Sequence, residues 1–516
     1  MLHDMCVSVP TESRLRASIQ GVDEARIVGF LRREDKMRCQ GLEQLSQLRA
    51  LECFSTVTRR AVFVACCQIT CAGCASLPDA AHEIEPAPAQ VVEFEGARGP
   101  VSAHKSDAIL DDLKRKSGDI DILQKHLAME QAINADSPLV LGNKLVLLQD
   151  GPATYQAMFA AIRQARNHIN LETYIFEDDD IGQQFSDLLL ERQSAGVQVN
   201  LIYDSVGCLN TPKEFFERLR TGGIQLLEFN PVNPLAGNKK EWLLNNRDHR
   251  KLLVIDGHIA FIGGINISES YSSGPSVKAP RKKGESDVGW RDTQLQIEGP
   301  VVAEFQKLFM STWAKQKGAP LAEKNYFPKL DKQGDEIVRA IGSASADPHS
   351  LIFLTLLSAI DNAEQRVHIT NAYFAPDPQL IKALTNAAQR GVDVKLILPS
   401  HTDSWAVFHA GRSHFTKLLR AGVKIYERRG AVMHSKTATI DGVWSTIGST
   451  NLDWRSFLHN DEINASMIGR DFSRQMESMF AKDLAESDAI DLARWERRSL
   501  LLRLKEWAAQ LMEYWL

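Results

Sequence analysis

Two stretches of the chain carry the same polar residues and glycines in the same order. The first contains His249, Lys251 and Asp256, and the second repeats these residue types 185 positions later, beginning at His434. Each residue type occupies only about one position in twenty by chance, so this agreement predicts two copies of one structural unit. The other matched positions are Lys436 and Asp441, followed by Gly263, Gly264 and Asn266 in the first copy and Gly448, Ser449 and Asn451 in the second.

Within each stretch the polar residues alternate as they would on a β-strand. Successive side chains of a strand point to opposite faces, so His249 projects with Lys251, and His434 projects with Lys436. A phosphodiester needs a nucleophile, a proton donor for the leaving alkoxide and cations around its free oxygens. Two facing copies would supply two histidines and two lysines, which predicts phosphodiester transfer at a shared site.

Histidine suits both the nucleophile and the acid. Its ordinary pKa of about 6.5 allows a neutral ring or a protonated ring near neutral pH. A carboxylate that accepts the second ring N–H would fix the tautomer, and we expect Asp292 and Glu462 to orient the two rings in this way.

Further residues of the two stretches are candidates for phosphate contact. Glycine permits a close approach of the backbone, and an asparagine amide donates hydrogen bonds. Asp256 and Asp441 belong to the candidate catalytic set, although they could instead cap turns or pair with a basic residue inside each half. The candidate phosphate contacts are Gly264, Ser449, Asn266 and Asn451.

Strands and helices are predicted to alternate in the same order in both halves. Extended runs at 169–176 and 197–204 enclose a helical segment, and the second half repeats this order at 367–374 and 392–399. Such alternation is typical of α/β units with helices covering a mixed sheet. We expect a first half-domain at 138–330, a connector at 331–345 and a second half-domain at 346–490.

Length and charge restrict the class of protein. The 516 residues predict two compact domains with additional segments. The net charge of −5 lacks the basic excess that is typical of nucleic-acid-binding proteins, so no nucleic-acid partner is expected. Seven of the eight cysteines lie in the first 75 residues, so no disulfide framework can hold the rest together, and no zinc-type spacing occurs.

One N-terminal segment is typical of a bacterial lipoprotein signal. Two arginines precede an apolar run at 61–71 that is too short to span a bilayer. The run ends in a lipobox-like sequence in which Cys74 would be acylated, although Cys71 stands where an aliphatic residue is favoured. A short buried apolar segment is the alternative. We expect the signal at 59–77, after an extension at 1–58 that could be an over-extended reading frame, and before a tether and a helix at 78–137.

The paired motifs resemble those of the phospholipase D superfamily, and within it the chain is similar to the bacterial cardiolipin synthases. The likeness also rests on residues 172–176, 261–266 and 448–456, and it extends from about residue 142 to residue 488. It implies two α/β/α half-domains packed about a pseudo-twofold axis, with the active site at their interface. It further implies a covalent phosphohistidine intermediate and neither a metal nor another cofactor.

The resemblance also implies roles for single residues. One histidine attacks phosphorus and the other protonates the departing glycerol oxygen, and we expect His249 as nucleophile and His434 as acid. The two lysines and two asparagines would hold the phosphoryl oxygens. The expected activity makes cardiolipin from phosphatidylglycerol, an anionic phospholipid.

Three other activities remain open. The first is a hydrolase that releases phosphatidic acid. The second is an endonuclease, which the acidic net charge and the expected export signal oppose. The third is an inactive scaffold, which the intact motifs oppose.

The C-terminal segment 491–516 is predicted to be an amphipathic helix. Leucine and tryptophan recur at helical spacing with basic residues among them, which suits an anionic bilayer surface. Packing against its own domain explains the same pattern. We expect a membrane-associated protein, on the periplasmic face if Cys74 is acylated and otherwise on the cytoplasmic face of the inner membrane.

Overall fold

The chain divides into two units, residues 1–76 and residues 77–516, of which the second is compact. The computed structural model describes parts of the second unit, namely Leu77 and residues 92–118, 120–232, 245–272, 289–345, 347 and 350–516. The expected extension at 1–58 and the expected signal, with Cys74, therefore lie outside the described residues, apart from Leu77.

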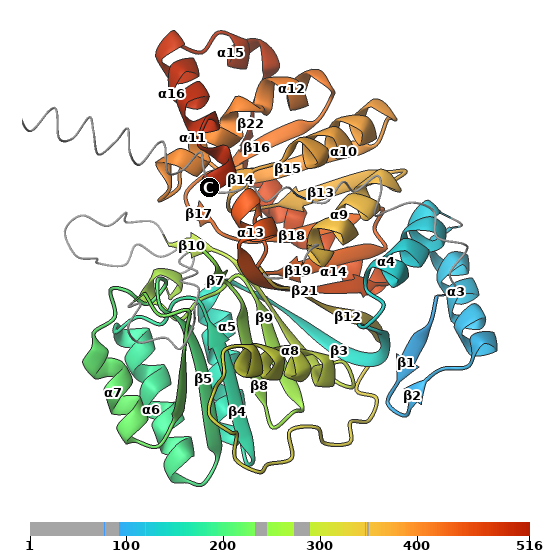
Figure 1. The fold of residues 1–516 in the computed structure, drawn as a ribbon. Helices are drawn as coiled ribbons and strands as arrows, with labels where there is room; N and C mark the ends of the chain where they lie inside the picture. The colour runs from blue at the N-terminus through green and yellow to red at the C-terminus, as the bar shows by residue number, and fades with distance from the viewer. Residues whose placement is uncertain are drawn as a thin grey trace, which may run out of the picture. The chain divides into compact units, whose positions relative to one another are not determined.

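The first half is built on a mixed sheet of seven strands (Figure 1). Their order across the sheet is β6–β5–β4–β8–β9–β11–β3. β4, β5 and β6 run parallel, and every other neighbouring pair is antiparallel. The strands are β3 (Leu139–Gln149), β4 (His168–Thr173), β5 (Gln198–Asp204), β6 (Gln225–Phe229), β8 (Lys251–Ile255), β9 (Ile259–Gly263) and β11 (Thr293–Glu298).

The second half repeats this order as β16–β15–β13–β18–β19–β21–β12, with β22 added beyond β16. The two sheets join where β3 pairs with its counterpart β12 in antiparallel fashion, as a twofold relation requires. The predicted α/β class with two packed half-domains is thus confirmed. The strands are β12 (Glu336–Ser343), β13 (Arg366–Thr370), β15 (Asp393–Pro399), β16 (Lys424–Arg428), β18 (Thr437–Ile440), β19 (Trp444–Gly448), β21 (Asn460–Ile468) and β22 (Ser487–Ala489).

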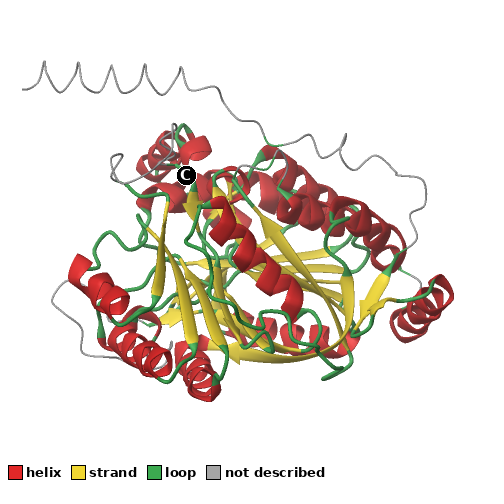
Figure 2. Cartoon of the chain, turned by 60° about the horizontal axis from the view of Figure 1, so that its bottom comes forward, coloured by secondary structure: helices red, strands yellow, loops and turns green. Residues whose placement is uncertain are grey.

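Helices cover the sheets on both sides (Figure 2). Phe305 and Phe309 of α8 and Met476 and Met479 of α14 share one apolar core with strands of both halves, so this layer ties the halves together. Separate outer cores lie under the remaining helices of each half. The helices are α5 (Asp150–Gln164), α6 (Asp180–Ser194), α7 (Lys213–Thr221) and α8 (Val302–Lys315) in the first half. The second half has α9 (Leu351–Asp361), α10 (Pro378–Gln389), α11 (Trp405–Ser413), α12 (Phe415–Arg420), α13 (Trp454–Leu458) and α14 (Arg470–Ala485).

Local sequence signals set the ends of equivalent helices. The Asp179 carboxylate accepts a hydrogen bond from the N–H of Gly182 at the start of α6 (2.8 Å), and Asp377 caps α10 in the same manner. Gly196 and Gly391 follow the two helices with φ of 90° and 93°, which glycine adopts without steric cost. Each turn leads directly into β5 or β15, so the two βαβ units have the same order and direction, although α6 has 15 residues and α10 has 12.

The segment expected to be a tether and a helix is folded against the joined sheet from residue 92 onward, with contacts to both halves. β1 pairs in parallel with β3. The buried Glu130 carboxylate accepts hydrogen bonds from Trp444 (3.2 Å) and Ser466 (2.6 Å), and it pairs with His126 (3.2 Å). Trp444 and Ser466 lie on strands β19 and β21 of the second half, whereas β1 pairs with β3 of the first half, so the segment is part of the folded domain rather than a linker. Its elements are β1 (Phe94–Gly96), β2 (Gly99–Pro100), α3 (Ala103–Ser117), a π-helical turn (Ile122–His126) and α4 (Leu127–Ile133).

Two further segments differ from the expected boundaries. The expected connector at 331–345 contains β12, which lies between β3 and β21 in the joined sheet. The C-terminal segment forms α15 (Leu492–Glu496), α16 (Leu500–Gln510) and a 3-10 turn (Glu513–Trp515) instead of one helix. Ser499 breaks the segment because its hydroxyl caps α16 through the N–H of Leu502 (3.4 Å). None of the helices in the described ranges has the length and apolar character needed to cross a membrane.

Candidate active site

Two short parallel strand pairs cross from one half to the other just before the motifs. β7 pairs with the start of β21, with Asp248 opposite Asp461. β17 pairs with β10, with Met433 opposite Arg291. The next residue on each strand is a motif histidine opposite a carboxylate of the other half, so neither pair can form within one half alone. The short strands are β7 (Arg247–Asp248), β10 (Trp290–Arg291) and β17 (Val432–Met433).

His249 is buried and faces Glu462. Its backbone N–H donates to the carbonyl of Asp461 (2.9 Å), and its Nδ1 lies 3.0 and 3.1 Å from the two carboxylate oxygens. Burial lowers the pKa of His249 to about 4. Burial alone would raise the pKa of Glu462, but the charge and hydrogen bond of His249 and the charge of Lys251 hold it below its usual value. An ionised carboxylate only accepts, so Nδ1 carries the proton and Nε2 keeps its lone pair for a substrate.

His434 has the corresponding partner in Asp292. Its Nδ1 lies 2.7 Å from Oδ2, and its backbone N–H donates to the carbonyl of Arg291 (2.8 Å). Burial raises the pKa of Asp292 to about 7 against the charge of Lys436. Burial, Lys436 and Lys251 together hold the pKa of His434 well below its usual value. The His434–Asp292 pair therefore takes up a proton near neutral pH, whereas Glu462 stays ionised.

The two motif lysines lie beside the histidines. Nζ of Lys251 donates to the carbonyl of His249 (2.6 Å), and Nζ of Lys436 lies 2.6 Å from the carbonyl of His434 and 3.0 and 3.1 Å from its ring nitrogens. Burial lowers the pKa of Lys436 to about 8, and burial together with the charge of Lys436 lowers that of Lys251 to about 7. A phosphodiester anion between the lysines would offset both effects, so the site is preorganised for such an anion.

Gly264 and Ser449 contact the carboxylates instead of an open phosphate pocket. A Cβ atom at Gly264 would lie 2.7 Å from Oδ2 and 2.8 Å from Cγ of Asp292, and closer still to Oδ1. Ser449 fills the equivalent position in the second half and donates its hydroxyl to Oε2 of Glu462 (2.5 Å). The close backbone approach expected at Gly264 therefore serves the Asp292 side chain.

The two motif asparagines are buried close to the site. Nδ2 of Asn266 donates to the Tyr271 hydroxyl (2.9 Å), and its Oδ1 accepts from the N–H of Ile175 (3.3 Å). The backbone N–H of Asn451 donates to Ser456 (3.2 Å), while its buried side-chain oxygen has no hydrogen-bond partner. Asn266 retains one N–H, so phosphate contact is compatible with its position.

Asp256 and Asp441 lie away from the histidines, which corrects their inclusion in the catalytic set. Asp256 accepts from the backbone N–H groups of residues 166, 167 and 168 at 2.7 to 2.9 Å. Asp441 does the same for residues 364, 365 and 366 at 2.8 to 2.9 Å. Strand β8 separates Asp256 from His249 by seven residues of extended chain, roughly 20 Å. Both carboxylates satisfy the N–H groups of the turn that enters β4 or β13, which is the turn-capping alternative.

Aromatic rings around the histidines lie outside the predicted set. Tyr174 contacts the His249 ring with centroids 5.1 Å apart, and Nζ of Lys251 stands 5.1 Å from the same tyrosine. Trp290 and Tyr373 lie 4.8 and 6.0 Å from the His434 ring. These rings explain the desolvation that shifts the histidine pKa values. Two of these rings, Tyr174 and Tyr373, could have been found from the sequence, because each follows shortly after one of the equivalent strands β4 and β13.

Arg250 is a second functional position that the sequence analysis missed. It follows His249 but points to the opposite face, where it is buried. It donates to the carbonyl of Glu462 (3.1 Å), the carbonyl of Ser343 (3.1 Å) and the hydroxyl of Thr312 (2.7 Å). These contacts hold the first motif against β12, β21 and α8, and so position Glu462 under His249.

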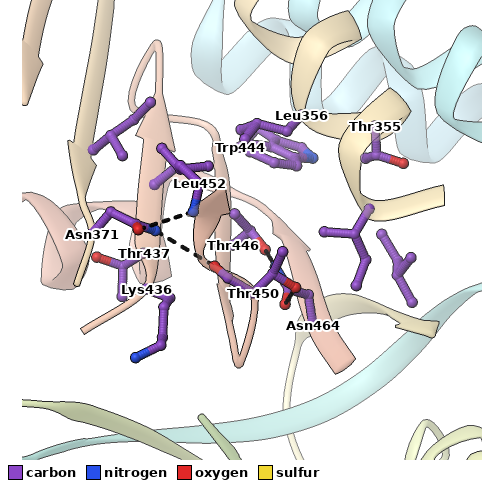
Figure 3. A pocket seen from close by; sticks show the side chains of 14 residues that line it. Thr355, Leu356, Asn371, Lys436, Thr437, Trp444, Thr446, Thr450, Leu452 and Asn464 are labelled. Atoms are coloured by element: carbon purple, nitrogen blue, oxygen red, sulfur yellow. Dashed lines mark hydrogen bonds between the residues drawn. The ribbon is translucent and has the colours of Figure 1, made fainter. Parts of the chain in front are cut away.

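A small cavity lies behind Lys436 in the second half. It measures about 30 Å³, which is room for one or two water molecules and not for a lipid headgroup. Figure 3 shows Thr446, Thr450 and Asn464 beside it, joined by hydrogen bonds, with Trp444 and Leu356 on its apolar side. Among the described residues, no group of three or more His, Cys, Asp or Glu side chains is arranged to hold a metal ion.

Comparison with known families gives one match that spans both halves. The family described as "Cardiolipin synthase, PLD-like domain" matches residues 158–313 and 356–484. The two segments contain both motifs together with Asp292 and Glu462. The match therefore covers the elements that build the site.

Two similar proteins carry the name cardiolipin synthase. A cardiolipin synthase of Geobacillus thermodenitrificans is 34% identical over 378 residues, 73% of each chain. Cardiolipin synthase A of Pseudomonas putida is 36% identical over 359 residues, 68% of this chain and 70% of that one. The crystal structure of a phosphatidylserine synthase from Haemophilus influenzae superposes with a TM-score of 0.53 at 12% identity, over 72% of this chain and 95% of that one, and shows the same fold.

Proposed function

The chain belongs to the family of cardiolipin synthases with phospholipase D-like domains, and from this premise we propose that it joins two phosphatidylglycerol molecules into cardiolipin with release of glycerol. It is a phosphatidyltransferase of the phospholipase D superfamily. The observation that carries the proposal is the pairing across the halves, because it gathers two histidines, two carboxylates and two lysines around one anion site.

The first step transfers the phosphatidyl group to the protein. The Nε2 lone pair of one histidine attacks phosphorus, and the bond from phosphorus to the glycerol oxygen breaks. The other histidine gives its proton to that oxygen, so neutral glycerol leaves and a phosphohistidine remains. Lys251 and Lys436 offset the charge that develops on the free phosphoryl oxygens.

The second step transfers the group to a new alcohol. A hydroxyl of another phosphatidylglycerol attacks phosphorus and loses its proton to the histidine that acted as acid. The N–P bond breaks, the first histidine becomes neutral, and cardiolipin is formed. The same histidine acts as acid and then as base, as reversal of proton transfer requires.

We assign the nucleophile to His249 and the acid to His434. Attack on phosphorus leaves positive charge on the nucleophilic ring, and the ionised Glu462 beside His249 stabilises that charge. The pKa of His434 itself lies well below its usual value, but burial raises the pKa of Asp292 to about 7, so this carboxylate takes up a proton near neutral pH and can hand it to Nδ1 while the Nε2 proton of His434 goes to the leaving oxygen. The different proton affinities of the two carboxylates support this division.

A product analysis tests the activity. Purified protein receives phosphatidylglycerol vesicles with a chelator present, and lipid and water-soluble products are identified. Cardiolipin and glycerol in equal amounts are expected. Phosphatidic acid without cardiolipin would assign the chain to the hydrolases, and cleaved DNA with untouched lipid to the endonucleases. His249→Ala and His434→Ala are the matched controls, and substantial turnover by either would contradict a shared site.

Attachment to the membrane is a further proposal that rests on the sequence. Cys74 lies in the lipobox-like segment, and its acylation would hold the enzyme on the periplasmic face. Metabolic labelling with a radioactive fatty acid is expected to mark the wild-type chain and not Cys74→Ser. An unlabelled wild-type chain would favour the cytoplasmic face.

A further inference from the structure

Helix α16 presents its large apolar side chains outward. Twelve large apolar side chains are exposed in the described part of the chain, and eight of them lie between Leu500 and Trp515, so exposure is concentrated in one segment. Leu500, Leu504, Trp507 and Leu511 are 74%, 61%, 60% and 68% exposed. Their spacing of four, three and four residues places them on one face of the helix. We call this surface the α16 face.

The opposite side of α16 packs against the second half through small and polar residues. Ala509 is fully buried against Ala375 and Ala410. Glu506 is also buried, and Arg498 pairs with its carboxylate at 2.8 Å. This amphipathic helix is therefore the reverse of an ordinary surface helix, which buries its apolar side. The internal packing fixes its orientation and leaves the α16 face without a partner in the chain as described.

The charges around the α16 face are predominantly basic. Residues 494–516 contain five arginine or lysine residues against three glutamates. All three glutamates are held by internal partners, since Glu496 pairs with Arg420, Glu506 with Arg498, and Glu513 with His414. Tryptophan and leucine flanked by basic side chains suit the surface of an anionic bilayer.

Hydrogen bonds link the C-terminal segment that contains α16 to the residues just before His249. The carbonyl of Leu516 accepts a hydrogen bond from the N–H of Arg455 (2.9 Å), and the Arg455 guanidinium donates to Asn245 (2.9 Å), which shortly precedes β7 and His249. α11, which packs against α16, begins at the half-exposed Trp405. Figure 1 shows α16 running down to the C-terminus near β14 (Phe374–Ala375), and Leu516 packs in the same apolar cluster as Ala375.

In the first half, exposed apolar residues lie after strand β5, in the loop that corresponds to the one carrying Trp405 in the second half. Val206 and Leu209 follow β5, as Trp405 follows its counterpart β15. Gly207, between them, lies against Tyr174, which contacts His249. The loop that carries Val206 and Leu209 thus contacts a tyrosine that touches His249.

We propose that the α16 face docks on an anionic phospholipid bilayer and holds the opening of the active site at the lipid surface. The choice of a lipid partner rests on the proposed function, whereas the docking surface itself rests on the exposure, charge and packing of α16. The bilayer would receive the leucine and tryptophan side chains at the depth of the headgroups, and the basic residues would meet lipid phosphates. Phosphatidyl headgroups would then enter the site without leaving the membrane surface.

The test compares the full chain with a triple variant, Leu504→Ser, Trp507→Ser and Leu511→Ser. Every protein carries Cys74→Ser, so that acylation at this position cannot contribute. Phe327→Ser, which removes another exposed apolar side chain outside this segment, is the control. Binding is measured by sedimentation with vesicles of phosphatidylglycerol and phosphatidylcholine, and hydrogen–deuterium exchange of residues 497–511 reports on α16 itself.

We expect anionic vesicles to slow exchange in α16 of the wild type and of Phe327→Ser, and not in the triple variant. Three lost apolar contacts should weaken vesicle binding through α16 roughly a hundredfold or more. Turnover of vesicle lipid should fall with binding, while turnover of monomeric short-chain phosphatidylglycerol stays within about twofold, because the site is intact.

Two results would overturn the inference. The first is equal slowing of α16 exchange in the triple variant and the wild type, or no slowing in either. The second is a dimer in solution that the triple variant dissociates while vesicle binding is unchanged, which would make the α16 face a contact between copies. Failure of the proposed function is a separate result, because it appears as no turnover of short-chain lipid by the wild type.

Discussion

Gly264→Ala tests whether the position of Asp292 controls the chemistry. The Cβ atom of alanine would lie 2.7 Å from Oδ2 and 2.8 Å from Cγ of Asp292, whereas nonbonded heavy atoms prefer about 3.5 Å. The backbone of Gly264 directly follows strand β9 and is held by that strand. The buried side chain of Asp292 is therefore the group that has to move. The required displacement is roughly 1 Å.

The displacement is large compared with the tolerance of the hydrogen bond. Nδ1 of His434 lies 2.7 Å from Oδ2 of Asp292. A shift of about 1 Å away from the ring would lengthen this distance beyond about 3.2 Å, the usual limit of a hydrogen bond. A misplacement of this size can lower a rate about a hundredfold, and loss of the carboxylate that fixes a histidine tautomer can lower it about 10⁴-fold. We therefore expect Gly264→Ala to lower kcat by about 10² to 10⁴, with little change in KM.

Cardiolipin formation from phosphatidylglycerol measures this effect, with Asp292→Ala as the scale for complete loss of the carboxylate. Gly96→Ala is the matched control, because a Cβ atom there would lie an ordinary 3.9 Å from Val101. Thermal unfolding of each variant establishes that the fold persists. A folded Gly264→Ala enzyme with more than a third of the wild-type kcat would refute the reasoning that this glycine makes room for the orienting carboxylate.

Three further predictions concern other parts of the site. Asp256→Ala removes the acceptor of three backbone N–H groups, so it should lower the free energy of unfolding by about 2 to 4 kcal/mol in denaturant titrations. Its kcat should stay within about twofold of the wild type, and a large loss of kcat in folded protein would return Asp256 to the catalytic set. The rate of cardiolipin formation should fall about tenfold per pH unit above pH 7. Burial raises the pKa of Asp292 to about 7, so the His434–Asp292 pair loses its proton above this pH. A rate that is constant from pH 6 to 9 contradicts the assignment of His434 as the acid. Ser449→Ala removes a hydrogen bond to Glu462 and should lower kcat about tenfold, and an unchanged kcat would show that Glu462 needs no support from this hydroxyl.

The duplicated fold could be predicted from the sequence because the two copies keep the same spacing through the part that forms the hairpins β8–β9 and β18–β19. Strand composition and the glycines that end α6 and α10 extended the prediction to the parallel strands. The attachment of the N-terminal segment could not be predicted in this way. It depends on buried polar contacts such as that between Glu130 and Trp444, which are more than 300 residues apart and follow no local pattern.

The histidines, the lysines and the orienting carboxylates of the candidate site could be predicted from the sequence, but the contacts between them could not. Asp292 and Glu462 do contact the histidines, but their sequence positions do not tell which histidine each one faces. That choice depends on the register of β7 with β21 and of β10 with β17, which only the packing of the halves determines. Motif spacing likewise could not separate Asp256 from His249, because both belong to one continuous pattern although they lie at opposite ends of a strand.

The two copies have kept the geometry of one site while differing in the groups that set proton affinity. Asp292 is short and lies directly over Gly264, where no hydroxyl can donate to it, and burial raises its pKa. Glu462 is longer by one methylene group, and its pKa is held below the usual value by the charge and hydrogen bond of His249, by the charge of Lys251 and by the hydroxyl of Ser449, although it is equally buried. A carboxylate with more donors holds its charge, and one with fewer holds a proton. The difference between glycine and serine at matched positions thus adds to the charges of His249 and Lys251 in keeping Glu462 ionised, and it contributes to the division of roles that we propose for the two histidines.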